Sequence, residues 1–395
     1  MNAQPIAPPR VSIAVRAWNE EAVIRRTLES IFGQSIFEEL HRRGERAEVV
    51  CIPNGCTDDT AGIALSVFIE QKKKHPFAKD FTCRVESIVQ AGRNNTWNAY
   101  VHEIAHRNAE FLFIMDSDIL FDRPTTLASM YALLLEREEA QIASDVQVKD
   151  IALKPKKSPL DRLSLATTDM TRQIEGQMTG QLYCIRADVA RRIWLPKDLG
   201  APDDGFLKAI VCTDFFTDRL DPRRVQIAPN ASHIFEAYTS PREILNNQKR
   251  QMIGQTTVHL LIEYMKALPL ERRLNLAETL RENDESDPDW LKRLIAGHLH
   301  GRRFWQLFPD ALTFRFNRWR KLKGLRRVTH FPAAIAGFIV TMIACFRAHR
   351  HLKRGQMHYW PKASRENIRH LELAPAPAAK PVARLTPTVE QPVEN

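Results

Sequence analysis

Phe111-Leu-Phe-Ile-Met-Asp-Ser-Asp118 joins an unbroken apolar run to two carboxylates separated by one serine. The run is short, aromatic and branched, a composition that predicts a buried strand over residues 111–115. Charged side chains directly after such a strand lie at the edge where open α/β sheets bind ligands. Carboxylate oxygens suit a hard divalent cation such as Mg²⁺ or Mn²⁺. Asp116 and Asp118 are therefore candidate metal ligands, with a solvated turn as the alternative.

Strand and helix patterns alternate through the amino-terminal third of the chain. This order is typical of parallel βαβ units and predicts a doubly wound sheet. Apolar runs predict the strands, and apolar residues at helical spacing predict the helices between them. The expected strands are 11–15, 48–52, 81–89 and 111–115, and the expected helices are 20–32, one capped by Thr57, and 95–107.

The pattern is more mixed after residue 120. Apolar runs predict strands over 142–148 and 180–185, with a short helix over 188–193 after the second. Residues 242–268 form a long helical pattern. Asp287-Pro288 offers a cap followed by proline at the first helical position, which predicts another helix start there.

The basic residues are unevenly distributed. The 395 residues carry a net charge of +10, and 302–327 holds nine Arg or Lys against one acid, Asp310. Clustered positive charge predicts an anionic partner, whether lipid headgroups, nucleic acid or an acidic polymer. The six cysteines show no metal-binding spacing, and residues 1–10 lack the apolar core of a signal peptide. Both features predict a cytoplasmic, reducing location.

Residues 331–346 contain no charged side chain and are bracketed by arginines. As a helix they would be about 24 Å long, shorter than the roughly 30 Å hydrocarbon core of a bilayer. We expect a membrane contact, either interfacial or a short span, with a buried core helix as the alternative. The Pro- and Ala-rich stretch 373–395 predicts a disordered tail.

Three polar loops follow or precede the elements of the predicted sheet. Residues 16–20, Arg-Ala-Trp-Asn-Glu, follow the first strand, where a loop leading into a helix can hold a nucleotide. Asn54, after the second strand, offers a donor and an acceptor to a base edge. Arg93, before the third helix, can pair with phosphate. Each has a structural alternative, as a helix end, a helix cap or a solvated loop.

Two further groups carry charge. Asp203 and Asp204 are adjacent acids that raise each other's proton affinity when buried, so one can act as a general base toward a hydroxyl. A helix N-cap pair is the alternative. Lys249 and Arg250 lie on the long helical pattern and can face a diphosphate, or form a solvated helix face. His233 and His259 are expected to be structural.

The order of these segments resembles a family 2 glycosyltransferase of the GT-A fold, over about residues 9–260. The segments are Ala-Trp-Asn-Glu, Asn-Gly-Cys-Thr-Asp, Gly-Arg, Asp-Ser-Asp, Gly-Gln-Leu-Tyr-Cys-Ile-Arg and Asp-Asp. The expected fold is a Rossmann-like, doubly wound mixed sheet with a helical C-terminal extension. The expected units are a flexible 1–8, a transferase domain over 9–270, a basic helical, membrane-associated extension over 271–372, and the tail.

The resemblance implies an inverting transferase that uses a nucleotide-diphosphate sugar and Mg²⁺ or Mn²⁺. It implies Asp204 as the general base beside Asp203, and a metal held by Asp116 and Asp118. The residues implied at the nucleotide sugar are Ala17, Trp18, Asn19, Glu20, Asn54, Arg93, Asp116 and Arg250. The implied acceptor is a lipid-linked or glycan hydroxyl in cell-envelope or exopolysaccharide synthesis, and nucleic acid is not an expected partner. The expected place is the cytoplasmic face of an anionic membrane.

Three departures from the family pattern bear on this expectation. Pro53 replaces an acid used in base recognition, and Asp203 replaces a glutamate. Gln251 stands where processive members carry tryptophan, which favours a single transfer over polymer synthesis. Two alternatives remain. A nucleotidyltransferase of the same fold would carry a glycine-rich loop after the first strand, whereas residues 16–20 contain no glycine. A non-catalytic membrane scaffold with a degenerate transferase domain would not need to retain Asp116, Asp118 and Asp204 together.

Overall fold

The computed structural model describes most of the chain. The described residues are 7–158, 161–162, 164–165, 178–200, 203–238, 240–302, 304–308, 313, 317, 319–320, 324, 327–328 and 331–356. The expected disordered tail over 373–395 and most of the expected flexible amino terminus lie outside the described residues.

In the described ranges, eight strands form one mixed sheet in the order β3-β2-β1-β4-β7-β6-β8-β5. The first four in this order are parallel, whereas β7 runs antiparallel to both β4 and β6. This mixed sheet confirms the predicted fold class. The strands are β1 (Val11–Ala17), β2 (Ala47–Pro53), β3 (Phe81–Val85), β4 (Phe111–Asp116), β5 (Leu120–Phe121), β6 (Ile142–Lys149), β7 (Leu182–Arg186) and β8 (Val225–Phe235).

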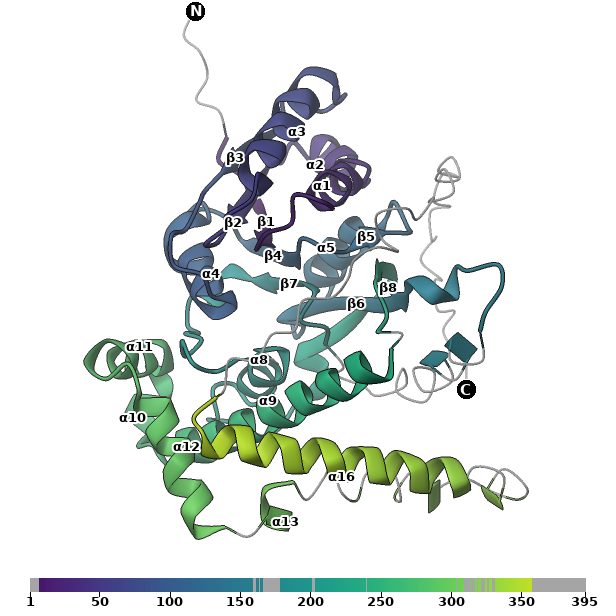
Figure 1. Ribbon diagram of the computed structural model, residues 1–395. Coiled ribbons are helices and arrows are strands. Elements are labelled where there is room, and N and C mark those ends of the chain that lie inside the picture. The colour runs from purple at the N-terminus through teal and green to yellow at the C-terminus, as the bar shows by residue number, and fades with distance from the viewer. Residues whose placement is uncertain are drawn as a thin grey trace, which may run out of the picture.

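Helices cover both faces of the sheet, as Figure 1 shows. Alternate residues of a strand point to opposite faces, and both faces are apolar here, so each needs a helical cover. Val11, Ile13 and Val15 in β1 belong to one buried apolar cluster, whereas Ala14 belongs to the other. The first cluster includes residues of α1 (Ile24–Phe32), α2 (Ile36–Arg43), α3 (Thr60–Lys74) and α5 (Thr126–Glu136).

The second cluster joins the other face of the sheet to the later helices. It includes buried residues of α4 (Arg93–Ala99), η1 (Tyr100–Ile104), α7 (Ala187–Ala190), α8 (Asp203–Cys212), α9 (Pro241–Ala267), α11 (Leu276–Ser286), α12 (Trp290–Gly301), α13 (Phe304–Leu307) and α16 (Phe331–Lys353). The short helix α10 (Leu270–Leu274) precedes α11. The helical C-terminal region therefore shares a core with the sheet.

Several elements begin or end away from their predicted positions. The prediction that Thr57 caps α3 is wrong, because the helix begins at Thr60 and the Thr57 N–H donates to Oδ1 of Asn19 (2.7 Å). Strand β3 stops at Val85, and the predicted helix over 95–107 begins at Arg93 and continues beyond Ala99 as a π-helix to Ile104. The predicted cap Asp287 instead follows the end of α11, and α12 begins at Trp290.

The long helix α9 matches its prediction over 242–268. Ser240 and Glu243 form a capping box at its amino end, with Pro241 at the first position, and this arrangement satisfies backbone N–H groups that the helix leaves unpaired. Helix α16, yellow in Figure 1, runs alongside α9. Among the described helices, none combines the length and apolar character needed to cross a membrane.

Candidate active site

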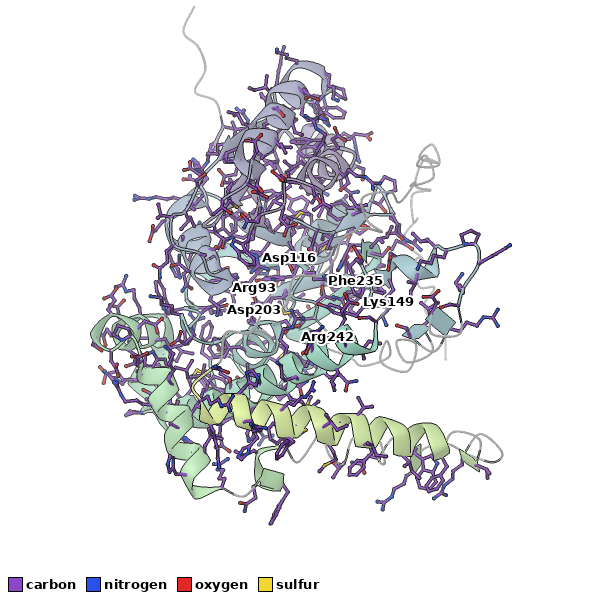
Figure 2. All side chains as sticks on the ribbon, viewed as in Figure 1. Arg93, Asp116, Lys149, Asp203, Phe235 and Arg242 are labelled. Atoms are coloured by element: carbon purple, nitrogen blue, oxygen red, sulfur yellow. The ribbon has the colours of Figure 1, made fainter. Side chains whose placement is uncertain are left out.

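The carboxyl ends of β1 and β4 place two opposite charges side by side. Arg16 in β1 pairs in register with Asp116, the last residue of β4. Both residues fall on the face that carries Ala14 and Ile114, which is covered by α4 and α8. Arg93 is the first residue of α4, and Asp203 is the first residue of α8. Both helices therefore begin at this edge of the sheet. Arg93, Asp116 and Asp203 lie close together in Figure 2.

Arg16, Arg93, Asp116 and Asp203 form a charge quartet in which each arginine bonds both carboxylates. Nη1 of Arg93 donates to both oxygens of Asp116 (2.8 Å each), and its Nε donates to both oxygens of Asp203 (3.1 Å each). Nη2 of Arg16 donates to Oδ1 of Asp116 (2.9 Å), and Nη1 lies 3.4 Å from Oδ2 of Asp203. Such charge-assisted bonds fix the positions of all four side chains.

Gly180, just before β7, completes the quartet with its backbone. Its carbonyl oxygen accepts from Nη2 of Arg93 (2.5 Å) and from Nη2 of Arg16 (3.1 Å). A Cβ atom at this position would lie 3.2 Å from Nη2 of Arg93 and 3.3 Å from Oδ1 of Asp203. The close approach of the backbone explains why a glycine suits this position.

The quartet shifts the pKa values of Arg93 and Asp203. Burial alone would lower the pKa of Arg93, but the charges of Asp116 and Asp203 outweigh it and raise the pKa. Burial alone would raise the pKa of Asp203, but Arg93 and Arg16 outweigh it and lower the pKa. At neutral pH Arg93 is therefore a cation and Asp203 is an anion.

Asp204 lies next to the quartet but outside it. Burial, together with the negative charge of Asp203, raises the pKa of Asp204 to about 6, and the backbone N–H of Gly205 donates to its Oδ1 (2.8 Å). Asp203 is 2% exposed and engaged by arginines, whereas Asp204 keeps partial exposure. A carboxylate with a pKa near neutrality at a ligand-binding edge can accept a proton.

The predicted nucleotide residues hold the neighbouring loops together. Nδ2 of Asn54 donates to the carbonyl of Ala17 (2.7 Å), and its Oδ1 accepts from the N–H of Gly92 (3.1 Å). Asn19 adopts a left-handed backbone conformation (φ 54°), which asparagine tolerates better than most residues. The Glu20 N–H donates to Oγ1 of Thr60 (2.7 Å). These contacts bring the three loops to one edge of the sheet, next to the quartet.

Trp18 and Arg250 are two further residues predicted to contact the nucleotide sugar. Trp18 is 40% exposed at the same edge, so its ring is accessible to a ligand. Arg250, midway along α9, donates from Nη2 to Oδ1 of Asn247 (3.0 Å). The roles of both residues in donor binding stay predictions.

The two predicted metal ligands differ in their surroundings. Both oxygens of Asp116 accept from guanidinium groups, so a cation at Asp116 would lie close to two positive charges. Asp118 follows the end of β4 and is partly exposed, and its carboxylate chemistry fits a hard divalent cation. In the described ranges, no three His, Cys, Asp or Glu side chains are placed to enclose a metal ion. Asp118 is thus the better-placed candidate.

The contacts of Arg16 and the buried pairing of Asp145 with His233 were not predicted from the sequence. Nδ1 of His233 lies 2.7 Å from Oδ2 of Asp145, and both side chains are fully enclosed. His233 of β8 therefore contacts a buried carboxylate of the neighbouring strand β6. Strand alternation was the available signal for Arg16, because it places Arg16 on the same face as Ser12 and Ala14.

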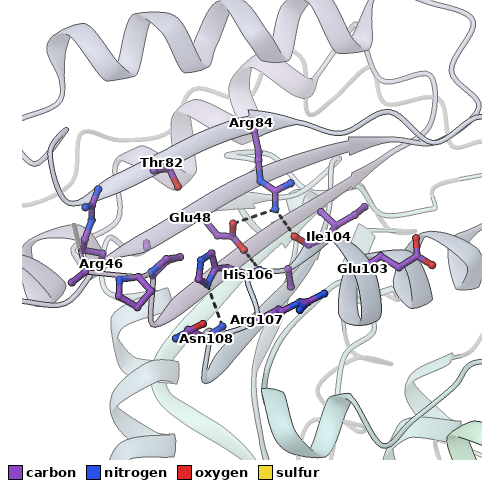
Figure 3. A pocket seen from close by; sticks show the side chains of 14 residues that line it. Arg46, Glu48, Thr82, Arg84, Glu103, Ile104, His106, Arg107 and Asn108 are labelled. Atoms are coloured by element: carbon purple, nitrogen blue, oxygen red, sulfur yellow. Dashed lines mark hydrogen bonds and ion pairs between the residues drawn. The ribbon is translucent and has the colours of Figure 1, made fainter. Parts of the chain in front are cut away.

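A surface cavity lies at the opposite end of the sheet (Figure 3). It is lined by residues near the amino ends of β2 and β3 and after η1, including Arg46, Glu48, Arg84 and His106. Glu48 there accepts from Oγ of Ser12 (2.6 Å), Nη2 of Arg84 (3.2 Å) and the N–H of His106 (2.7 Å). The Glu48 carboxylate is thus already paired with groups of the fold.

Comparison with known proteins supports the predicted class. The sequence model of the family described as Glycosyl transferase family 2 matches residues 12–187, a range that contains Arg16, Arg93, Asp116, Asp118 and Gly180. No curated protein matches the chain in sequence.

Two solved structures illustrate the likeness in fold. One is TarS residues 1–349 of S. aureus, at 14% identity and a TM-score of 0.45, covering 88% of this chain and 92% of that one. Another is glucosyl-3-phosphoglycerate synthase from Mycobacterium tuberculosis in complex with Mg²⁺ and uridine diphosphate, at 17% identity and a TM-score of 0.40, covering 66% and 80%. Residues 12–187 are thus similar to the glycosyltransferase domain of glycosyl transferase family 2.

Proposed function

We propose that the chain is an inverting glycosyltransferase that moves a single sugar from a nucleotide-diphosphate sugar to a hydroxyl of a lipid or oligosaccharide acceptor. The observation that carries this proposal is Asp204, a carboxylate with a raised pKa beside the arginine–carboxylate quartet. Inversion needs one direct displacement, in which a single base removes the proton of the attacking hydroxyl. The transferase unit would span residues 9–270.

The side chains at this edge of the sheet would have separate roles in the transfer reaction. Asp204 would take the proton from the acceptor hydroxyl as its oxygen attacks the anomeric carbon from the face opposite the leaving group. Arg93 would stabilise the negative charge that develops on the departing nucleoside diphosphate. Trp18, Asn19 and Asn54 would border the nucleotide, because their loops meet beside the quartet.

A divalent ion would be held mainly by Asp118, with oxygens of the donor diphosphate as further ligands. Mg²⁺ or Mn²⁺ bound there would neutralise charge on the diphosphate. Asp116 would serve chiefly as the partner of Arg16 and Arg93, which keeps both guanidinium groups aimed at the donor side of the sheet edge.

The protein is expected to release nucleoside diphosphate from a nucleotide sugar. The rate of this release should fall when the pH drops below about 6. Asp204 must be ionised to act as a base, and the pKa of its carboxyl is raised to about 6. Activity should therefore rise as the pH increases through about 6. Nucleoside diphosphate released from a panel of donors, with membranes and oligosaccharides as acceptors, measures this across a pH series.

The same assay separates the alternatives. Release of pyrophosphate from a nucleoside triphosphate would show a nucleotidyltransferase. A chain that binds and consumes no donor would be a scaffold. Activity that is constant from pH 5 to pH 8 would contradict the role of Asp204.

We also propose that the C-terminal helices bring the enzyme to the cytoplasmic face of an anionic membrane. The face of α16 turned away from α9 carries exposed apolar side chains: Phe331, Ile335, Ile339, Ile343 and Phe346. Its opposite face buries Ala344, Cys345 and Ala348. The carboxyl end of α16 carries exposed basic residues, which are Arg347, Arg350 and Lys353 within the helix and Arg354 directly after it. An apolar stripe with basic neighbours is the arrangement of interfacial helices.

Replacing Ile335, Ile339 and Ile343 together by aspartate is expected to abolish binding to vesicles that contain phosphatidylserine. Each isoleucine would lose about 1 kcal/mol of membrane transfer, which lowers affinity roughly a hundredfold for the three together. Leu65 and Ile69 are exposed apolar residues of α3 and provide the matched aspartate control. Co-sedimentation measures the effect. Equal binding by the two variants, or no binding by the unchanged chain, would contradict the membrane contact.

A further inference from the structure

We propose that Arg16 is a positioning residue for the transfer reaction, which acts on Asp204 by holding the neighbouring carboxylate of Asp203. This inference rests on the proposed role of Asp204 as the general base. Arg16 lies in the first strand, far in sequence from α8, and contacts the start of that helix through Asp203.

The geometry makes Arg16 the link between three segments. Its Nη2 donates to Asp116 at the end of β4 (2.9 Å) and to the carbonyl of Gly180 before β7 (3.1 Å). Its Nη1 contacts Asp203 at the start of α8 (3.4 Å). Arg16 is only 5% exposed, so its effect on a substrate would pass through the groups that it contacts.

Stability alone gives a weak reason for such a residue. A buried ion network contributes little over a well-packed apolar replacement, because desolvation offsets the attraction between the charges. Nε of Arg16 is also buried and has no hydrogen-bond partner in the part of the chain that the structure describes, which is a further cost. The property that distinguishes Arg16 from an apolar side chain here is its positive charge between Asp116 and Asp203.

That charge reaches Asp204 through Asp203. Helix α8 packs against α9, η3 (Pro222–Arg224) and β8, but the charges acting on Asp204 come from Asp203 beside it and from Arg93 at the start of α4. The negative charge of Asp203 favours the protonated form of Asp204, and Arg16 offsets part of that charge. Without Arg16, Asp203 would keep only Arg93, and Asp204 would hold its proton to a higher pH.

The test is a titration of the Asp204 carboxyl by NMR in the full chain labelled with ¹³C at aspartate Cγ. The Asp204 signal is assigned by its loss in Asp204→Asn. In Arg16→Met, which keeps much of the length but removes the charge, the titration midpoint should rise by about one pH unit. Arg16→Lys keeps the charge and should restore most of the original midpoint. Arg25→Met removes an arginine that pairs with Glu70 on the helices of the other face and should leave the midpoint unchanged.

An unchanged midpoint in folded Arg16→Met would overturn the proposal. If thermal unfolding shows that this variant does not fold, Arg16→Gln carries the same comparison, since glutamine is neutral and can still donate to Asp116. A midpoint shift in Arg16→Lys as large as in the neutral variant would also overturn it, because the effect would then follow packing rather than charge. The titration needs no turnover, so full activity of Asp204→Asn would exclude Asp204 as the general base but would leave the measured link between Arg16 and the Asp204 carboxyl to be decided by the titration.

Discussion

Replacing Asp204 by asparagine is expected to abolish sugar transfer while binding of the nucleotide sugar survives. Asparagine matches the shape of aspartate but cannot take a proton from the acceptor hydroxyl, so the rate should fall by a factor of roughly 10²–10⁴. Within the described residues, the Asp204 side chain accepts from the N–H of Gly205 at its own helix end and is not a member of the quartet, so the fold and the quartet should persist. Initial rates of nucleoside diphosphate release, with donor affinity by calorimetry, measure both consequences.

Asp188→Asn is a suitable control for the Asp204 substitution. Asp188 is an exposed acid in the first turn of α7, where the change alters the charge of the chain equally but away from the quartet. It should leave the rate and donor affinity unchanged. Comparable losses in the two variants would show that net charge, rather than the proton acceptor, explains the effect.

Replacing Arg93 by methionine is expected to reduce both turnover and stability. Arg93 joins Asp116 and Asp203, and its contacts with these carboxylates (2.8 and 3.1 Å) are shorter than those of Arg16 (2.9 and 3.4 Å). Its removal takes away a cation at the leaving group, which should lower the rate by roughly 10²–10³. It also leaves the buried Asp203 and the partly buried Asp116 with Arg16 alone, which should lower the free energy of unfolding by about 3 kcal/mol. Rates at saturating donor and denaturant unfolding measure the two effects.

Arg84→Met is the matched control for Arg93. Arg84 pairs with Glu48 and Glu86 at the opposite end of the sheet, so its loss should affect stability but leave turnover of the folded enzyme unchanged. Arg93→Lys, which retains the charge but not the forked contacts, should lie between the methionine variant and the unchanged chain. Normal turnover by folded Arg93→Met would exclude Arg93 from leaving-group stabilisation.

The parallel half of the sheet could be predicted from the sequence because its signals are local. Each of these strands is rich in apolar residues, since parallel strands are covered on both faces, and the apolar run over 111–115 ends one residue before β4 does. The strand β8 was not predicted from the sequence, because Pro229 and several polar side chains, including Asn230, interrupt its apolar residues. Its buried segment around His233 depends on pairing with β5 and β6, which no local pattern reveals.

The candidate site was predictable in part. Loop chemistry after strands identified Asn54, Arg93 and Asp116, because carboxyl ends of neighbouring parallel strands meet at one edge. The pairing of Arg93 with Asp203 could not be predicted, since it joins residues far apart in sequence and depends on where α8 begins. The orientation of α16 also depends on tertiary packing, because its buried side chains include the small residues Ala344, Cys345 and Ala348, whereas larger apolar side chains of the same helix are exposed.

Donor binding and transfer by Asp204→Asn, measured on one preparation of the full chain, test the central claim most directly. The proposed role of Asp204 predicts donor affinity within about twofold of the unchanged enzyme and at least a hundredfold slower transfer at pH 8, on the order of the contribution of a general base. Transfer by Asp204→Asn at the rate of the unchanged enzyme would contradict that role.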